Sequence, residues 1–260
     1  MTGTYVIVTG WQEAGGRLVL RAVAGMPPLH GFPFGGPGAY RPGAGDFLAC
    51  ADGGYRFARA AGVEPDAVIG DLDSLTAEDL QALADRCACA ADDEPRRPQV
   101  IRHPKEKDDT DTMLCVKDGI ARGYSNFCIL GGLGGDFAHT VATLQALSFL
   151  TDMECAARVE TGAETVFMLD GVTLRELEAG VETHETAIEG TAGQAFSVFS
   201  YAERTVHVAI DGDVKYPLAD AVLTQSYPVG LHNEFAGSGP CRARIACGYG
   251  RLLVVYSHQR

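Results

Sequence analysis

The sequence has no long apolar run and carries far fewer basic than acidic residues. No stretch reaches the roughly 18 apolar residues that span a bilayer, and residues 1–8 lack the basic and apolar segments of a secretion signal. The chain has 21 Lys and Arg against 34 Asp and Glu, a formal net charge of -13. Such a charge repels nucleic acid and anionic membranes, and Arg96-Arg97 is too short to form a basic patch. We therefore expect a cytoplasmic protein with no nucleic-acid or membrane partner.

Two familiar patterns for binding metals and phosphates are also missing. The eight cysteines include no CxxC pair, so we expect buried reduced thiols rather than a zinc site or a disulfide framework. The glycine-rich segments lack the Gly-Lys-Ser/Thr ending of a Walker loop, which excludes a P-loop as the phosphate-binding element. The turns suggest no Ser-His-Asp or Cys-His catalytic arrangement either.

The first half of the chain alternates between strand-like and helix-like segments. Alternation of this kind is typical of a parallel sheet covered on both faces, and 260 residues suffice for two domains. We therefore predict an α/β domain with a mostly parallel sheet over residues 1–153. The expected strands are 5–9, 46–50, 67–69, 99–103 and 127–130, and the expected helices are 55–61, 76–85, 111–122 and 140–150.

The pattern changes after about Met153. Short, often alternating apolar segments separated by Gly or Asp turns predict an antiparallel sandwich or barrel-like domain over residues 154–260. The expected strands are 157–160, 164–169, 171–174, 195–199, 205–210, 242–246 and 251–256. Residues 26–45 are too rich in Pro and Gly for a helix or a central strand, so we expect a surface loop, with an ordered flap as the alternative.

Acidic side chains follow the predicted strands of the first half. Asp52 comes after one strand, and Asp71 and Asp73 come after the next. Residues two apart in an extended segment share one face, and carboxylates are the hard oxygen ligands that magnesium prefers. Ligands of parallel sheets collect at the carboxyl ends of the strands. We therefore expect a Mg²⁺ site that binds phosphate, although a single such turn is more often just solvated.

Two further segments support a phosphate site. Asp108 and Asp111 flank Thr110 at the start of a predicted helix, where backbone N–H groups can bind phosphate. The run 131–135, Gly-Gly-Leu-Gly-Gly, lets the backbone approach a ligand closely, although a tight strand-to-helix turn would need glycine anyway. Trp11, the only tryptophan, is expected to pack rather than to stack on a ligand.

These segments together resemble the thiamine pyrophosphokinase (thiamine diphosphokinase) family. Their order and approximate spacing match it in Asp52-Gly-Gly, Ile69-Gly-Asp-Leu-Asp-Ser74, Glu106-Lys-Asp-Asp-Thr-Asp111 and Leu130-Gly-Gly-Leu-Gly-Gly135 through His139-Thr140. Residues 212–218, 230–235 and 250–255 resemble the family's carboxyl-terminal segments. The similarity covers almost the whole chain outside the Pro/Gly loop.

The resemblance implies a fold, a reaction and an assembly. It implies an α/β domain that binds ATP and Mg²⁺ over residues 1–153 and a β-sandwich domain that binds thiamine over residues 154–260. The thiamine hydroxyl would attack the β-phosphorus of Mg-ATP, giving thiamine diphosphate and AMP. The family also implies a homodimer, with thiamine near the domain and subunit boundary. Such a transfer depends mostly on positioning and charge stabilisation.

The family's site residues carry over to specific positions. Asp71, Asp73 and Asp108 resemble carboxylates that hold magnesium or face the phosphates, and with Asp111 they form the expected catalytic set. One of these carboxylates is expected to accept the hydroxyl proton, and the sequence does not select it. Substrate contacts are expected from Asp52, Gly53, Lys107, Thr110, Gly134, Gly135, His139, Tyr216 and Asn233. Of these, Tyr216 stands where the family often has an aromatic residue beside thiamine, and Asn233 matches the Asn of its Ser-Asn pair.

Three positions depart from the family pattern. The pattern Gly-Gly-Arg-x-Asp-His reads here with Asp136 in place of Arg and Ala138 in place of Asp, and His232 replaces the Ser before Asn233. The missing cation would have to come from Lys105, Lys107 or Arg122. Alternative interpretations are a catalytically impaired relative that binds a nucleotide or thiamine compound, and a magnesium-dependent phosphohydrolase.

Overall fold

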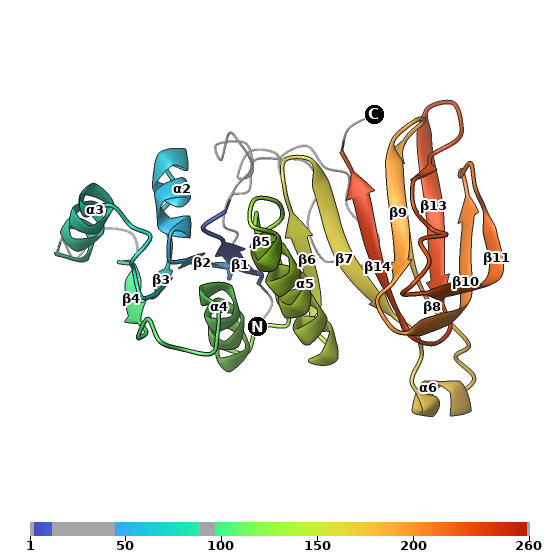
Figure 1. Ribbon diagram of the computed structural model, residues 1–260, viewed down its shortest axis with the longest axis horizontal. Coiled ribbons are helices and arrows are strands. Elements are labelled where there is room, and N and C mark those ends of the chain that lie inside the picture. The colour runs from blue at the N-terminus through green and yellow to red at the C-terminus, as the bar shows by residue number, and fades with distance from the viewer. Residues whose placement is uncertain (1–2, 12–44, 89–96, 259–260) are drawn as a thin grey trace. The chain divides into compact units, whose positions relative to one another are not determined.

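A computed structural model describes residues 3–11, 45–88 and 97–258 (Figure 1). The predicted Pro/Gly loop lies outside the described residues except for Gly45. The described chain forms two compact units, one that ends at Gly162 and one that begins at Ala163. The sequence places the domain boundary after Met153 instead. The structural division comes later because strand β6 (Ala156–Glu160) pairs in parallel with β5 (Asn126–Leu130) and extends the first sheet.

The first unit is built on a parallel sheet. Its strands lie in the order β6-β5-β1-β2-β3-β4, and every neighbouring pair is parallel. The remaining strands are β1 (Tyr5–Val8), β2 (Phe47–Ala51), β3 (Ala67–Gly70) and β4 (Gln99–Arg102). All residues of β1 and β3 are buried, as continuous apolar runs predict for a sheet with both faces covered.

Helices cover both faces of this sheet (Figure 1). They are α2 (Gly54–Ala61), α3 (Ala77–Ala88), α4 (Asp111–Ala121) and α5 (Phe137–Asp152). In Figure 1, α2 and α3 lie on one face and α4 and α5 on the other. The chain runs outward from β2 to β4 on one side of β1 and from β5 to β6 on the other. In such sheets a crevice opens where the winding direction reverses, which here is at the carboxyl ends of β1 and its neighbours.

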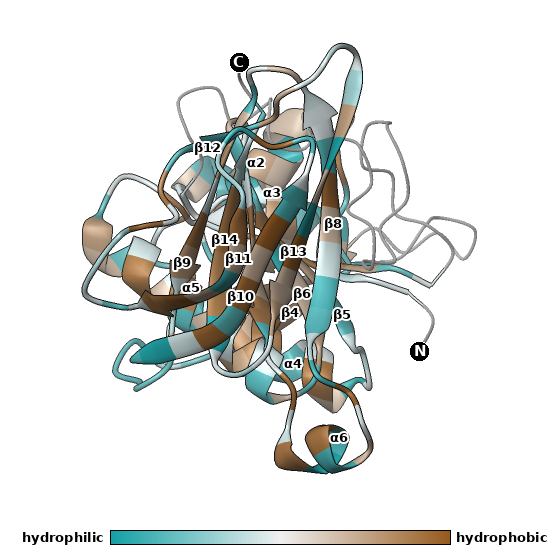
Figure 2. Cartoon of the chain, turned by 90° about the vertical axis from the view of Figure 1, so that its right-hand side faces the viewer, coloured by the Kyte–Doolittle hydropathy of each residue, from teal (hydrophilic) through white to brown (hydrophobic). Residues whose placement is uncertain are grey.

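The second unit contains two antiparallel sheets. One has the order β12-β9-β14-β7 and the other β11-β10-β13-β8. The strands are β7 (Glu164–Asp170), β8 (His184–Thr191), β9 (Ala195–Ser200), β10 (Arg204–Gly212), β11 (Leu218–Thr224), β12 (Asn233–Glu234), β13 (Pro240–Cys247) and β14 (Arg251–Ser257). Hydrophobic and hydrophilic segments alternate along β10 in Figure 2, as expected for a sheet with one buried face.

One hydrophobic core joins the two sheets of the second unit. It contains Phe167 and Val254 from one sheet and Ile210 and Ile245 from the other, all at most 1% exposed. Side chains from two facing sheets that share one core define a β-sandwich. The predicted fold class, a mostly parallel α/β domain followed by an antiparallel β-sandwich, is therefore confirmed.

Some predicted elements differ from the structure. Residues 171–174 were expected to form a strand, but α6 (Leu174–Glu178) begins there because Thr173 and Glu176 form a reciprocal capping box. Helix α5 begins at Phe137, before the expected residue 140, because the Asp136 side chain accepts a hydrogen bond from the backbone N–H of Ala138.

Two simpler features of the chain follow from its composition. Five of the seven described cysteines are buried, and all seven are free thiols. No helix in the described part of the chain is both long and apolar enough to cross a membrane.

The sandwich core provides a test of the packing. Leu252 is fully buried on β14, whereas Leu174 of the same unit is 75% exposed. We expect Leu252→Ala to lower the free energy of unfolding by about 2–5 kcal/mol, because it removes buried methyl groups and leaves a cavity. The same substitution at Leu174 should change it by less than about 0.5 kcal/mol. Urea unfolding followed by circular dichroism measures both, and equal effects would contradict the described core.

Candidate active site

Three aspartates meet where two neighbouring strands end. Asp52 follows β2, and Asp71 and Asp73 follow β3. One carboxylate oxygen from each lies within 4.8 Å of those of the other two. The parallel pairing of Ala51 with Ile69 sets this geometry, and the backbone N–H of Asp52 donates to the carbonyl of Ile69 at 2.9 Å. The sheet register therefore brings Asp71 and Asp73 together with Asp52, whereas Asp108, the third predicted metal ligand, is not part of this group.

Unusual backbone conformations keep these carboxylates close. Asp52 and Leu72 have φ values of 42° and 67°, in the left-handed region that non-glycine residues seldom adopt. At Gly70 a Cβ atom would lie 2.9 Å from the Cβ of Asp52 and 3.0 Å from Oδ1 of Asp111. Only glycine fits there without displacing an acidic side chain. Backbone strain of this kind is concentrated at functional sites.

Asp52 has an unsatisfied oxygen. The residue is 4% exposed, and its Oδ2 accepts a hydrogen bond from the backbone N–H of Ser74 at 3.3 Å. Its Oδ1 is buried and has no hydrogen-bond partner among the described residues. A buried acceptor without a partner costs free energy, and a hard cation between carboxylates would satisfy it. The donor set of Asp52, Asp71 and Asp73 therefore fits Mg²⁺.

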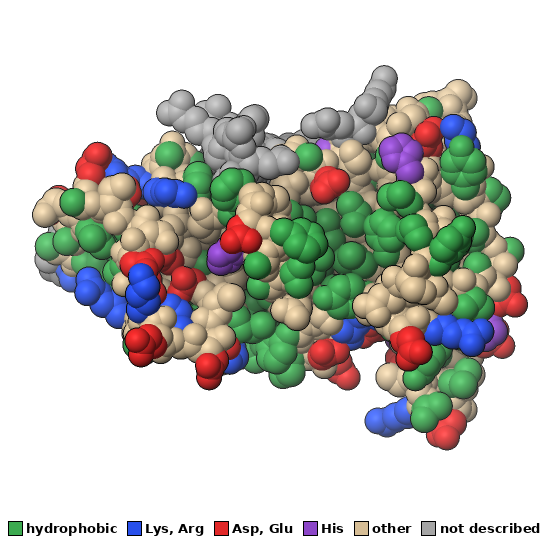
Figure 3. Space-filling view, viewed as in Figure 1, with side chains coloured by type: hydrophobic (Ala, Val, Ile, Leu, Met, Phe, Trp, Pro, Cys, Tyr) green, Lys and Arg blue, Asp and Glu red, His purple; other side chains and the backbone are tan. Residues whose placement is uncertain are grey.

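Two lysines lie against the acidic side chains. The Nζ of Lys107 is 2.9 Å from Oδ1 of Asp111 and 3.3 Å from Oδ2 of Asp71, and the Nζ of Lys105 is 2.5 Å from Oδ2 of Asp73. Figure 3 shows acidic and basic side chains in contact on one face of the first unit, at the left of the view. These pairs leave the carboxylates in excess over the two ammonium groups.

The surroundings shift the pKa values of these groups. The backbone N–H of Asp73 lowers the pKa of Asp71, and the ion pair with Lys107 adds to this effect. Burial raises the pKa of Asp111 despite its ion pair with Lys107, and the nearby charges of Asp52 and Asp71 raise it further. The excess negative charge at the strand ends thus acts on Asp111, and a bound cation would relieve it.

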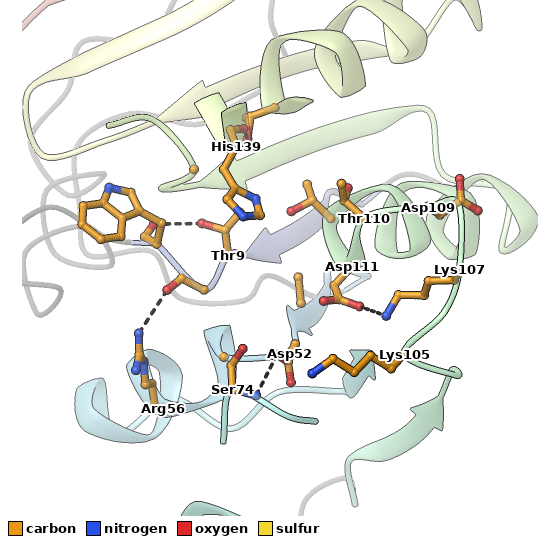
Figure 4. Close-up of a pocket in the computed structure, with 17 residues that line it drawn as sticks. Thr9, Asp52, Arg56, Ser74, Lys105, Lys107, Asp109, Thr110, Asp111 and His139 are labelled. Atoms are coloured by element: carbon orange, nitrogen blue, oxygen red, sulfur yellow. Dashed lines mark hydrogen bonds and ion pairs between the residues drawn. The ribbon is translucent and has the colours of Figure 1, made fainter. Parts of the chain in front are cut away.

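A cavity of about 410 Å³ opens beside the acidic group (Figure 4). This volume lies within the range of small-molecule sites, roughly 300–1,000 Å³. Its walls come from the ends of β1, β2 and β5, from the segments that follow β3 and β4, and from the starts of α2, α4 and α5. The predicted residues that line it are Asp52, Gly53, Lys107, Thr110, Asp111 and His139, and the other lining residues include Thr9, Trp11, Arg56, Ser74, Lys105 and Asp109.

Other predicted residues lie outside the cavity wall. Asp71 and Asp73 belong to the acidic group, whereas Asp108 is exposed and is part of neither that group nor the wall. Gly134 and Gly135 form the turn before α5, against the indole of Trp11, where a Cβ atom at Gly135 would lie 2.4 Å from the ring. Trp11 thus packs on the glycine turn and also lines the cavity.

Of the three basic residues considered for the missing cation, two line the cavity and one does not. Lys105 and Lys107 line the cavity. Arg122 lies elsewhere: its guanidinium donates to Asp118 at 2.6 Å and to Gln99 at 2.8 Å, and it stacks 4.3 Å from the ring centroid of Phe47. Arg122 is therefore part of the helix packing of the first unit.

Sequence reasoning missed Arg56. This residue lies in the first turn of α2, four residues after Asp52, and its side chain lines the cavity. Asp52 precedes the helix and has a left-handed backbone conformation, so no helical spacing links the two side chains. The sequence therefore offers no signal for Arg56, because a basic residue in a predicted helix is usually a solvated one.

Tyr216 and Asn233 lie together in the second unit. Asn233 is 4% exposed, and its side-chain amide donates to the carbonyl of Tyr216 at 2.7 Å and accepts from the N–H of Tyr216 at 3.1 Å. The ring of Tyr216 is exposed, with the ammonium of Lys215 5.3 Å from its centroid. Asn233 therefore holds the backbone that presents the Tyr216 ring.

Comparison with known proteins agrees with these features. Residues 44–157 match the family model described as thiamin pyrophosphokinase, catalytic domain. No curated protein matches the chain. The thiamine pyrophosphokinase of Bacillus subtilis superposes with a TM-score of 0.74 at 18% identity, covering 99% of this chain and 100% of that chain.

Two further solved structures are similar. The thiamin pyrophosphokinase of Geobacillus thermodenitrificans gives a TM-score of 0.71 at 19% identity over 98% of both chains. The yeast enzyme gives 0.66 at 14% identity, covering 98% of this chain and 86% of that chain. At these identities the structures establish the fold, and with the family model they confirm the resemblance to thiamine pyrophosphokinases.

The acidic group leads to a test of metal binding. We expect Asp73→Asn to weaken Mn²⁺ or Mg²⁺ binding by about tenfold or more, because it removes one anionic oxygen ligand. Asp85→Asn is the matched control, since Asp85 is an exposed aspartate on α3 that accepts a hydrogen bond from Gln81. Isothermal titration calorimetry without nucleotide measures both, and an unchanged affinity in Asp73→Asn would remove Asp73 from the metal site.

Proposed function

We propose that this chain, whose residues 44–157 match the thiamin pyrophosphokinase catalytic domain, transfers the diphosphoryl group of Mg-ATP to thiamine. The hydroxyl oxygen of thiamine bonds to the β-phosphorus, the bond from that phosphorus to the α–β bridging oxygen breaks, and AMP leaves. The observation that carries the proposal is the group of Asp52, Asp71 and Asp73, with its buried, unpartnered oxygen, beside a cavity lined by basic side chains.

The proposed magnesium ligands are Asp71 and Asp73, with Asp52 as a third carboxylate. Asp108 is proposed to face the same metal or the phosphates when substrate is bound, since it is exposed and directly follows Lys107. Magnesium held there would neutralise negative charge on the diphosphoryl group, the main requirement of this reaction class.

Lys105 and Lys107 are proposed to bind phosphate oxygens. Both ammonium groups line the cavity, and both lie within 3.3 Å of carboxylates. Burial alone would lower the pKa of Lys107, but its ion pairs with Asp111 and Asp71 raise it. Lys107 therefore keeps its positive charge near neutral pH. Thr110, whose hydroxyl accepts from the backbone N–H of Met113 at 3.1 Å, fixes the start of α4 beside these lysines.

Asp111 is proposed to accept the proton of the thiamine hydroxyl. Burial raises its pKa, and a carboxylate with a raised pKa is a stronger base. Asp111 also lines the cavity. His139 and the glycines Gly53, Gly134 and Gly135 are proposed to shape the nucleotide side of the same cavity.

The second unit is proposed to bind thiamine through Tyr216, in a homodimer. The exposed aromatic ring of Tyr216 can stack on the flat rings of thiamine. Asn233 is then a positioning residue, because its amide is engaged with the backbone of Tyr216.

The reaction is tested by incubating the protein with Mg-ATP and thiamine. We expect AMP and thiamine diphosphate in equal amounts, and a loss of about a hundredfold or more in Asp73→Asn. Asp85→Asn should retain activity. Chromatographic detection of both products measures this. Phosphate release without thiamine would favour a phosphohydrolase, and nucleotide or thiamine binding without products would favour a non-catalytic relative.

The thiamine side has its own test. We expect Tyr216→Ala to raise KM for thiamine by about tenfold, as loss of one aromatic stacking contact does, and to leave KM for ATP within about twofold. Tyr249→Ala is the matched control, because Tyr249 is also exposed in the second unit. Steady-state kinetics with each substrate varied in turn measures both. An equal rise in the two variants would remove Tyr216 from the thiamine site.

A further inference from the structure

The cavity is lined by three basic side chains, and they differ in how their charge is neutralised. Lys105 and Lys107 each lie against aspartates. The guanidinium of Arg56 has no carboxylate within ion-pair distance among the residues that the structure describes. Its Nη2 donates to the backbone carbonyl of Gly10 at 3.3 Å. Arg56 is thus the cation of this wall whose charge remains available to a ligand.

The place of Arg56 in the cavity suits an extended anion. Figure 4 shows the Arg56 side chain rising from α2 toward the end of β1, with Asp52 between it and the side chains of Lys105 and Lys107. The hydrogen bond to Gly10 fixes one edge of the guanidinium, and its carbon lies 4.8 Å from the ring centroid of Phe57. An anion that runs past Asp52 would meet the lysines at one end and Arg56 at the other.

The position at which the family pattern has arginine does not supply this charge. Asp136 is the N-cap of α5, and its carboxylate accepts from the N–H of Ala138 at 2.8 Å. Asp136 is not among the residues that line the cavity. Its carboxylate is engaged with the helix start.

We propose that Arg56 binds the phosphate chain of the nucleotide, at the end of the cavity away from Lys107. This inference rests on the proposed function for the identity of the ligand. A guanidinium presents two parallel N–H donors that match a phosphate group, and it stays charged at any pH the protein meets. Arg56 thereby supplies the positive charge that an arginine supplies at position 136 in the family pattern.

The test measures nucleotide binding rather than turnover. With Mg²⁺ present, we expect Arg56→Gln to weaken binding of ATP and of inorganic tripolyphosphate by about 10-fold to 100-fold, as loss of charged hydrogen bonds does. Arg56→Lys should recover part of this affinity, because it keeps the charge and loses the fork of donors. Isothermal titration calorimetry measures the affinities, and circular dichroism verifies that each variant is folded.

Arg59→Gln is the matched control. Arg59 lies on the same helix, pairs with Glu78 at 2.7 Å and with Asp79 at 2.9 Å, and does not line the cavity. We expect its affinity for ATP to stay within about twofold of the wild type. Wild-type affinity in Arg56→Gln, or an equal loss in Arg59→Gln, would overturn the proposal.

A second variant examines Asp136 directly. Asparagine caps helices as well as aspartate does, so Asp136→Asn keeps α5 intact and removes the charge. We expect its affinity for tripolyphosphate to stay within about threefold of the wild type, because the carboxylate faces α5. An increase of tenfold or more would place this carboxylate against the phosphates and would contradict the assignment.

The outcomes separate this inference from the proposed function. Tight binding of ATP that depends on Arg56, without formation of thiamine diphosphate, would uphold the inference and reject the transfer reaction. Formation of thiamine diphosphate with unchanged nucleotide affinity in Arg56→Gln would reject the inference and uphold the transfer reaction. A wild type that binds neither ATP nor tripolyphosphate would reject both.

Discussion

Mutual repulsion among carboxylates at the ends of two paired strands is the constraint on which the site depends. Oxygens of Asp52, Asp71 and Asp73 lie within 4.8 Å of one another, and like charges this close destabilise a fold unless cations intervene. The parallel register of β2 and β3 and the absence of a side chain at Gly70 enforce the approach. Lys105 and Lys107 offset part of the repulsion. Because the carboxylates remain in excess, the same fold that concentrates the negative charge creates affinity for a cation.

The sequence predicts most of the first unit because most strands there are short apolar runs that end in a turn. Buried strands such as β1 and β3 carry this signal in every residue. The second unit is harder to predict. Strand β11 is largely exposed, so it lacks the alternation that marks a half-buried strand, and α6 depends on the capping box of Thr173 and Glu176 rather than on periodicity. Local hydrogen bonds can thus override the apolar pattern that favours a strand over residues 171–174.

The acidic part of the site follows from the sequence because strand ends of a parallel sheet meet at one edge. Asp71 and Asp73 are identified by their place after a strand, and the sheet register then adds Asp52. The basic part does not follow in the same way. Whether Arg56 or Arg122 faces the cavity depends on how each helix packs, and Arg122 is drawn away by Asp118 and Phe47. The packing of each helix is a matter of tertiary structure, and no spacing in the sequence distinguishes Arg56 from Arg122.

Asp136 illustrates how a change of charge in a family pattern can be a structural one. A carboxylate at the N-cap accepts a backbone N–H and complements the positive end of the helix dipole. Arginine at that position would leave the N–H of Ala138 without this acceptor, at a cost of about 1 kcal/mol. The substitution therefore stabilises the start of α5, where His139 lines the cavity. A cation on helix α2, on the other face of the sheet, makes that stabilisation compatible with phosphate binding, because Arg56 reaches the cavity from a helix other than the one that Asp136 caps.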